Sequence, residues 1–158
     1  MNARQPEWVR FAALEYVRTM ASYKQLKQMK LDRIDELKAI MEGLGAARYD
    51  REGGAAPYRD RIPDIIDTIE DMVDTLAGDI EREERDYQRA LDLFQSDDRA
   101  LMVWEKYGLR MRWAAIARKR GYTERACQYH ALTGMRIIFD NMPPEYRRVH
   151  VNAEEWTR

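Results

Sequence analysis

Cysteine is nearly absent from this chain of 158 residues, which contains only Cys127. A lone cysteine excludes an internal disulfide framework. Cys127 falls on the inner side of a predicted helix, where we expect a small core residue rather than a nucleophile or a metal ligand. The two histidines, His130 and His150, have no cysteine or histidine companion at ligand spacing. We therefore expect neither a metal nor a cofactor.

Long apolar runs are also lacking. The most apolar stretch, Trp8 to Met20, carries Arg10, Glu15 and Arg18, and a bilayer span needs about twenty apolar residues. Pro6 suits the first turn of a helix here. We expect this helix to pack within the chain or across a dimer. Binding to a membrane surface is the weaker alternative, because the helix has no strongly basic face.

No convincing strand pattern is present, so no phosphate-binding glycine loop follows a strand. The apolar residues between positions 62 and 94 recur instead at intervals of seven, with an interruption at Glu83. This spacing is typical of a coiled-coil seam. The seam residues are Ile62, Ile66, Ile69, Val73, Leu76, Ile80, Tyr87, Ala90 and Phe94.

A second helix near Ser22 to Leu44 is the expected partner of this seam. Its matching residues are Tyr23, Leu26, Ile34, Leu37, Met41 and Leu44. The glycine-rich stretch from Gly43 to Pro57 should break both helices and leave a flexible loop at about 43 to 60. We thus predict an all-α chain with an N-terminal helix and hairpin over 1–94, a helix-turn-helix over 95–142 and a tail over 143–158.

Acidic residues are concentrated on the longer predicted helix. Asp64, Asp67, Asp71 and Asp74 form a stripe away from the seam, which we interpret as a solvated face. Glu81 and Glu84, together with Asp67 and Asp71, also have the spacing of half a magnesium site in all-α nucleotide pyrophosphohydrolases. No second half follows in the chain, so we expect no enzyme.

Charge is divided unevenly along the chain. Residues 99–148 hold eleven Lys or Arg against four Asp or Glu, whereas residues 61–98 hold four against thirteen. The net charge of −1 conceals this division. A basic C-terminal part is suited to contact nucleic-acid phosphates.

Residues 112 to 132 read as a helix, a tight turn and a second helix. Trp113, Ile116 and Ala117 give the first helix one apolar face. Gly121 supplies the left-handed residue of a sharp turn, and Thr123 can cap the second helix. This pattern predicts a helix-turn-helix, whose second helix fits the major groove of DNA.

The second helix has a predicted inner and outer side. Cys127, Ala131, Met135 and Ile138 recur at helical spacing and should face the core. The expected base-reading residues on the outer side are Glu124, Arg125, Gln128, Tyr129 and Thr133. The expected phosphate contacts are Arg110, Arg112, Arg118, Lys119, Arg120 and Thr123.

The region from Arg99 to Met135 resembles the fourth region of bacterial sigma factors, and more closely phage regulators of the RinA and ArpU type. The matching residues are Tyr107, Met111, Trp113, Ile116, Ala117, Gly121, Tyr122, Thr123 and Arg125. In these families a glycine commonly stands at the position of Arg110 and a Ser or Thr cap at that of Arg112. Gly134 replaces a helix-favouring alanine, at a cost of up to about 1 kcal/mol.

The resemblance implies a phage or prophage activator of late genes that binds double-stranded DNA in the cytoplasm of a bacterial host. In this interpretation the helical hairpin supplies either a homodimer contact or a contact with RNA polymerase. The alternative is a structural or protein-interaction module that does not bind DNA.

Overall fold

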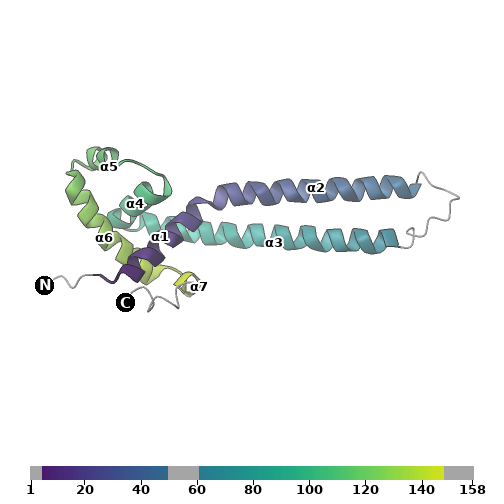
Figure 1. The fold of residues 1–158 in the computed structure, drawn as a ribbon, viewed down its shortest axis with the longest axis horizontal. Coiled ribbons are helices and arrows are strands. Elements are labelled where there is room, and N and C mark those ends of the chain that lie inside the picture. The colour runs from purple at the N-terminus through teal and green to yellow at the C-terminus, as the bar shows by residue number, and fades with distance from the viewer. Residues whose placement is uncertain (1–4, 50–60, 148–158) are drawn as a thin grey trace. The chain divides into compact units, whose positions relative to one another are not determined.

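The computed structural model describes residues 5–49 and 61–147, and all regular elements in these ranges are helices (Figure 1). The all-α prediction is therefore confirmed. In chain order the elements are α1 (Glu7–Ala21), α2 (Tyr23–Tyr49), α3 (Ile62–Gln95), α4 (Asp98–Val103), the π-helix η2 (Trp104–Gly108), α5 (Trp113–Arg120), α6 (Glu124–Asn141) and α7 (Pro144–Arg147). The chain forms two compact units, residues 24–85 and residues 1–23 with 86–158.

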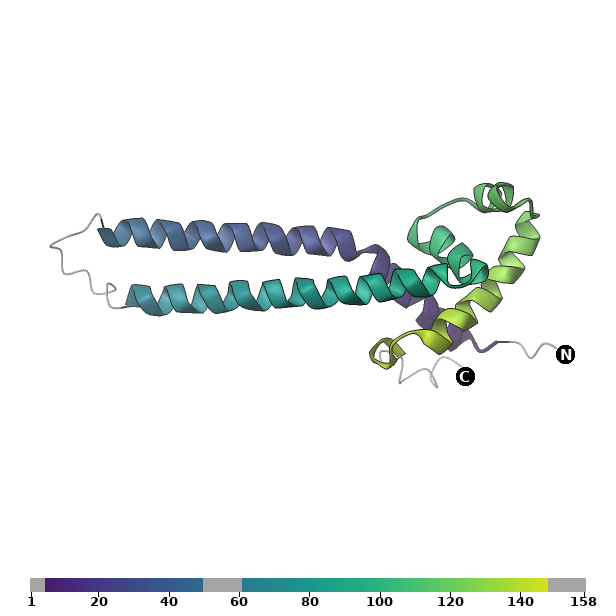
Figure 2. The same cartoon turned by 180° about the vertical axis from the view of Figure 1, so that it is seen from behind.

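In the first unit, α2 and α3 run side by side in opposite directions, as both views show (Figures 1 and 2). The predicted seam is confirmed in part, because Ile62, Ile69 and Ile80 are buried while Ile66, Val73 and Leu76 are half-buried. Lys30 forms an ion pair with Glu83, and Lys27 lies 3.3 Å from Glu84. The interruption of the seam at Glu83 is thus matched by a lysine on the facing helix.

Two details of the predicted hairpin are wrong. Leu26 is 44% exposed rather than part of the seam, because Lys27 and Lys30 face α3 in this stretch. Helix α2 also continues through Gly43 and Gly45 to Tyr49, since a helical glycine costs only about 1 kcal/mol relative to alanine. Residues 50–60 of the expected loop lie outside the described residues.

In the second unit, α1 packs against α6 and also contacts the C-terminal end of α3, which belongs to the same unit. The rings of Trp8 and Phe139 meet edge to face at 5.1 Å, and Tyr16 contacts Phe94 at 5.8 Å. The predicted boundary after residue 94 therefore does not coincide with the division of the chain. The buried side of α1, with Ala13, Tyr16 and Val17, joins the core of this unit because removing apolar surface from water is favourable.

The C-terminal segment of this unit is also ordered against the core. Pro144–Arg147 forms the short helix α7, and Tyr146 packs beside Tyr16 with ring centroids 4.9 Å apart. The Arg147 side chain donates hydrogen bonds to the backbone oxygens of Asp140 and Met142. The predicted tail thus includes a packed part. Its remainder, from residue 148, lies outside the described residues.

Candidate nucleic-acid interface

The turn between α5 and α6 has the predicted geometry. Gly121 ends α5 in the left-handed conformation, with φ 70° and ψ 28°, and the amide of Tyr122 donates to the carbonyl oxygen of Ala117 at 3.0 Å. Thr123 caps α6, because its hydroxyl oxygen accepts from the amide of Ala126 at 3.1 Å. The first residue of α6 and the last of α5 are therefore fixed by local chemistry.

The predicted inner side of α6 is buried. Cys127, Ala131, Met135 and Ile138 are all at most 4% exposed. Around Cys127 pack Met102, Ile116 and Ala117, with the half-buried Met111 and Trp113 beside them. Burial raises the pKa of the Cys127 thiol, so the thiol stays protonated and the residue acts as a small core side chain.

The five predicted base-reading residues are all exposed on the outer side of α6. Tyr129 is 58% exposed. Within the described part of the chain, neither Arg125 nor Gln128 has a hydrogen-bond or ion-pair partner. Their donor groups are consequently open to an external acceptor.

An open hollow lies beside this outer side, and sequence reasoning did not identify it. Its lining includes Tyr107, Trp113, Arg125, Tyr129 and Leu132. Tyr107 and Trp113 meet edge to face at 6.4 Å. Helical spacing placed Trp113 on the inner face of α5, but it is only half-buried, and that face continues into the hollow. The polar side chains of α6 therefore lie beside the aromatic rings of Tyr107 and Trp113 in this hollow.

Three of the predicted phosphate-contacting arginines, Arg110, Arg112 and Arg118, are exposed. Arg110 adopts a positive φ of 57°, the conformation that a glycine adopts without strain. Arg112 begins α5 without a side-chain cap. Thr123 is exposed as well, although its hydroxyl oxygen already serves as the helix cap.

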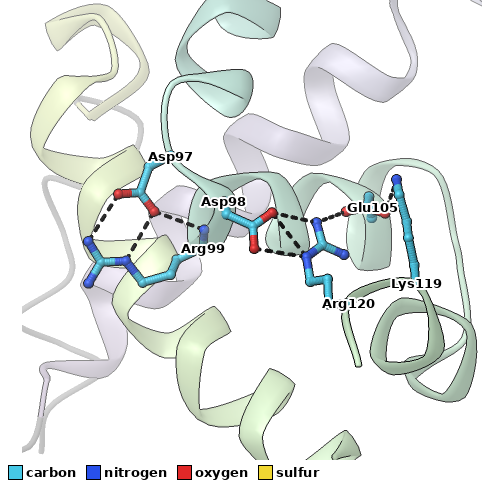
Figure 3. Close-up of polar contacts among 6 residues, drawn as sticks. All are labelled: Asp97, Asp98, Arg99, Glu105, Lys119 and Arg120. Atoms are coloured by element: carbon cyan, nitrogen blue, oxygen red, sulfur yellow. Dashed lines mark hydrogen bonds and ion pairs between the residues drawn. The ribbon is translucent and has the colours of Figure 1, made fainter. Parts of the chain in front are cut away.

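Arg120 has a different role from the one predicted. Its guanidinium forms ion pairs with Glu105 and with Asp98, the Nε atom lying 3.0 Å from each Asp98 carboxylate oxygen (Figure 3). The side chain is only 8% exposed, and that of Glu105 only 2%. Arg120 therefore does not reach a phosphate in this arrangement. It joins the end of α5 to α4 and η2.

Burial and ion pairing oppose each other at this arginine. Desolvation by burial lowers its pKa, but the hydrogen bonds to Asp98 and Glu105 outweigh it and hold the pKa above the ordinary value. Arg120 is thus fully charged inside the unit. Lys119 shares Glu105 at 3.2 Å but is 60% exposed (Figure 3), so its ammonium group remains open to a further anion.

The residues considered for a magnesium site do not gather. Among the residues that the structure describes, no three His, Cys, Asp or Glu side chains are placed to hold one metal ion. Glu84 instead pairs with Lys27. In the same ranges, every helix is too short or too polar to cross a membrane.

Comparisons with models of known protein families, with curated protein sequences and with solved structures find no match for this chain.

Proposed function

We propose that this protein is a sequence-specific DNA-binding regulator of transcription, with α5, the glycine turn and α6 acting as a helix-turn-helix. The observation that carries the proposal is the outer side of α6, where Arg125 and Gln128 are exposed, have no partner among the described residues and adjoin a basic helix. Residues 110–129 contain six Lys or Arg against one acidic residue. Excess positive charge around an exposed helix is the electrostatic feature expected of a DNA-binding surface.

In this proposal the N-terminal half of α6 enters the major groove. Arg125 can donate two hydrogen bonds to guanine, and Gln128 can make a paired contact with adenine. Glu124 can accept from cytosine, while Tyr129 and Thr133 supply further contacts to base edges. These side chains determine sequence preference, since the groove presents a different donor and acceptor pattern for each base pair.

Phosphate contacts would position the helix without reading sequence. Arg110, Arg112, Arg118 and Lys119 are the exposed cations available for this purpose, and Thr123 is exposed at the start of α6. Arg120 is left out because its charge is neutralised inside the unit by Asp98 and Glu105. Its expected contribution is to hold α5 in place.

The biological role rests on the resemblance to phage regulators of the RinA and ArpU type. That resemblance supports activation of late genes of a phage or prophage in the cytoplasm of a bacterial host, and the helical hairpin is the part of the chain that could contact RNA polymerase. Selection of fragments from the genome that encodes the protein, followed by sequencing of the bound pool, identifies the operator and tests this role directly.

The selected duplex then allows base contacts and phosphate contacts to be separated by fluorescence anisotropy. Arg125→Ala should reduce the preference for the selected over a scrambled duplex by about tenfold, because one bidentate contact is worth roughly 1 to 3 kcal/mol. Arg118→Ala should weaken binding to both duplexes alike and lower the logarithmic salt slope by about 0.9.

Arg89→Ala is the matched control, because it removes the same charge from an exposed site on α3 outside the proposed interface. It should leave both the preference and the salt slope near the wild-type values. Failure to select any fragment, or equal effects of all three substitutions, would contradict the proposal.

A protein-binding module is the second candidate, and the aromatic hollow beside α6 favours it. Tyr129 and Leu132 are 58% and 38% exposed, and exposed aromatic and aliphatic groups often anchor protein interfaces. This candidate predicts no affinity for DNA at any salt concentration. The same titrations therefore distinguish the two functions.

A further inference from the structure

The hairpin of α2 and α3 has an exposed apolar side that its own seam does not cover. The large apolar residues on it are Leu26, Met29, Ile40, Ile65 and Met72, each 42% exposed or more. Together with the polar residues between them they form what we call the neutral face. Exposure of apolar groups to water costs free energy, so burial of this face against a further surface would be favourable.

These residues lie on one side of the helix pair. Ile40 directly precedes a seam position of α2, and Ile65 and Met72 directly precede seam positions of α3. In an antiparallel helix pair, such positions flank the seam on the same side. The Lys30–Glu83 ion pair shows which residues of α2 and α3 lie opposite each other. Ile40 and Met72 both lie about three helical turns from this pair in the same direction, so they are neighbours across the two helices. Helices with apolar residues beside the seam positions are typical of bundles with more than two helices.

The polar groups on the neutral face already have partners within their own helix. Arg33 pairs with Glu36 at 3.0 Å, and Arg82 pairs with Asp79. The hydroxyl groups of two threonines, Thr68 and Thr75, donate to backbone carbonyl oxygens one turn earlier, each at 2.9 Å. Covering this face would therefore leave few new unsatisfied polar groups.

Charge distinguishes this face from the rest of α3. Arg33 and Arg82 balance Glu36 and Asp79, so the face carries no net charge. The stripe of Asp64, Asp67, Asp71 and Asp74 lies on the other flank, where two like copies would repel each other. Two identical hairpins can thus meet through the neutral face without a net electrostatic cost.

The size of the face matches a stable interface. The named residues extend from Leu26 on α2 to Ile65 on α3, and by the Lys30–Glu83 register Ile65 lies opposite the C-terminal end of α2. The face is therefore roughly 30 Å long and, with two adjacent helices, about 20 Å wide. It covers roughly 600 Å² on each copy, which is within the range of specific protein interfaces, at its lower end. We propose that a second copy of this chain docks on the neutral face and that the two hairpins form a four-helix bundle.

Sedimentation equilibrium of the full-length protein tests this proposal without DNA, so its outcome is independent of the proposed function. The wild type should show twice the chain mass of 18.8 kDa. The double variant Ile40→Glu with Met72→Glu should weaken dimerisation at least about tenfold, which corresponds to 1.4 kcal/mol. The seam residues are unchanged, so circular dichroism should show wild-type helix content.

Leu31→Glu is the matched control. Leu31 is 38% exposed on the same helix, but it directly follows a seam position and lies on the opposite flank. It should leave the dimer intact. If the charged double variant loses helix content, Ile40→Ala with Met72→Ala replaces it, because alanine favours helices, and the same tenfold weakening is expected.

A monomeric wild type throughout the micromolar range would overturn the proposal. A dimer that survives loss of Ile40 and Met72, or that dissociates equally with Leu31→Glu, would also overturn it.

Discussion

Replacing Gly134 with alanine should destabilise the protein, although helix propensity predicts a gain of about 1 kcal/mol. Gly134 is buried in α6 where the start of α4 crosses it. A Cβ atom at this position would lie 2.1 Å from the carbonyl oxygen of Arg99 and 2.5 Å from its carbonyl carbon. The obstacle is backbone, so no change of rotamer can relieve the contact.

The expected magnitude follows from the displacement that the methyl group imposes. Carbon atoms in contact lie about 3.5 to 4.0 Å apart, so α4 and α6 must separate by more than about 1 Å. Overpacking of this kind costs about 1 to 3 kcal/mol. With a backbone obstacle we take the upper value, and subtracting the propensity gain leaves a loss of about 2 kcal/mol, or about 4 to 8 °C in Tm.

Urea unfolding followed by far-ultraviolet circular dichroism measures this loss. Gly78→Ala is the matched control, because a Cβ at Gly78 in α3 meets no atom within 4 Å. It should stabilise the protein by about 0.5 to 1 kcal/mol. If Gly134→Ala is as stable as the wild type, the close approach of α4 and α6 is not as described and the reasoning fails.

Three further predictions concern the second unit. Glu105→Ala leaves the buried Arg120 with Asp98 as its remaining partner and should cost about 3 kcal/mol in urea unfolding, whereas an unchanged midpoint would mean that the pair is not buried in solution. Arg110→Gly should raise the Tm by about 2 to 4 °C, because it relieves about 1 kcal/mol of left-handed strain; an unaltered Tm would show that no strain exists. The side chain of Arg99 donates hydrogen bonds to Asp97 and holds the pKa of that carboxyl below its ordinary value. The lower pKa belongs to the folded state, so this carboxylate stabilises the fold above about pH 4 and loses its effect as the pH falls further. The stability difference between the wild type and Asp97→Asn should therefore shrink in acid, and a difference independent of pH would contradict this assignment.

Much of the candidate interface follows from local sequence. Gly121 and Thr123 define the turn because a left-handed residue and a capping hydroxyl act on amides within a few positions. The spacing of Cys127 and Met135 identifies the buried side of α6 by helical periodicity alone. The exposure of Arg125 on the other side follows from the same periodicity.

Other features depended on contacts between distant segments. Arg120 has the same local pattern as Arg118, yet only Arg120 lies opposite Glu105 and Asp98. The seam of α3 indicated a partner helix, but the prediction that Leu26 belongs to this seam was wrong. The ion pair between Lys30 and Glu83 turns a different side of α2 toward α3, and a pair between two helices cannot be read from the spacing within one of them. The glycine pair at 43 and 45 suggested a break, which the continuing helix outweighs.

The sequence by itself determined most of the helices, the buried side of α6 and the turn before it, since these depend on interactions over four residues or fewer. Only the tertiary structure decided that α1 joins α6, that Arg120 is buried with Glu105, and that Gly134 must lack a side chain beneath Arg99. The physical reason is that packing partners are chosen by shape and charge between segments far apart in the chain. Helical periodicity tells which side of a helix is covered, but not what covers it.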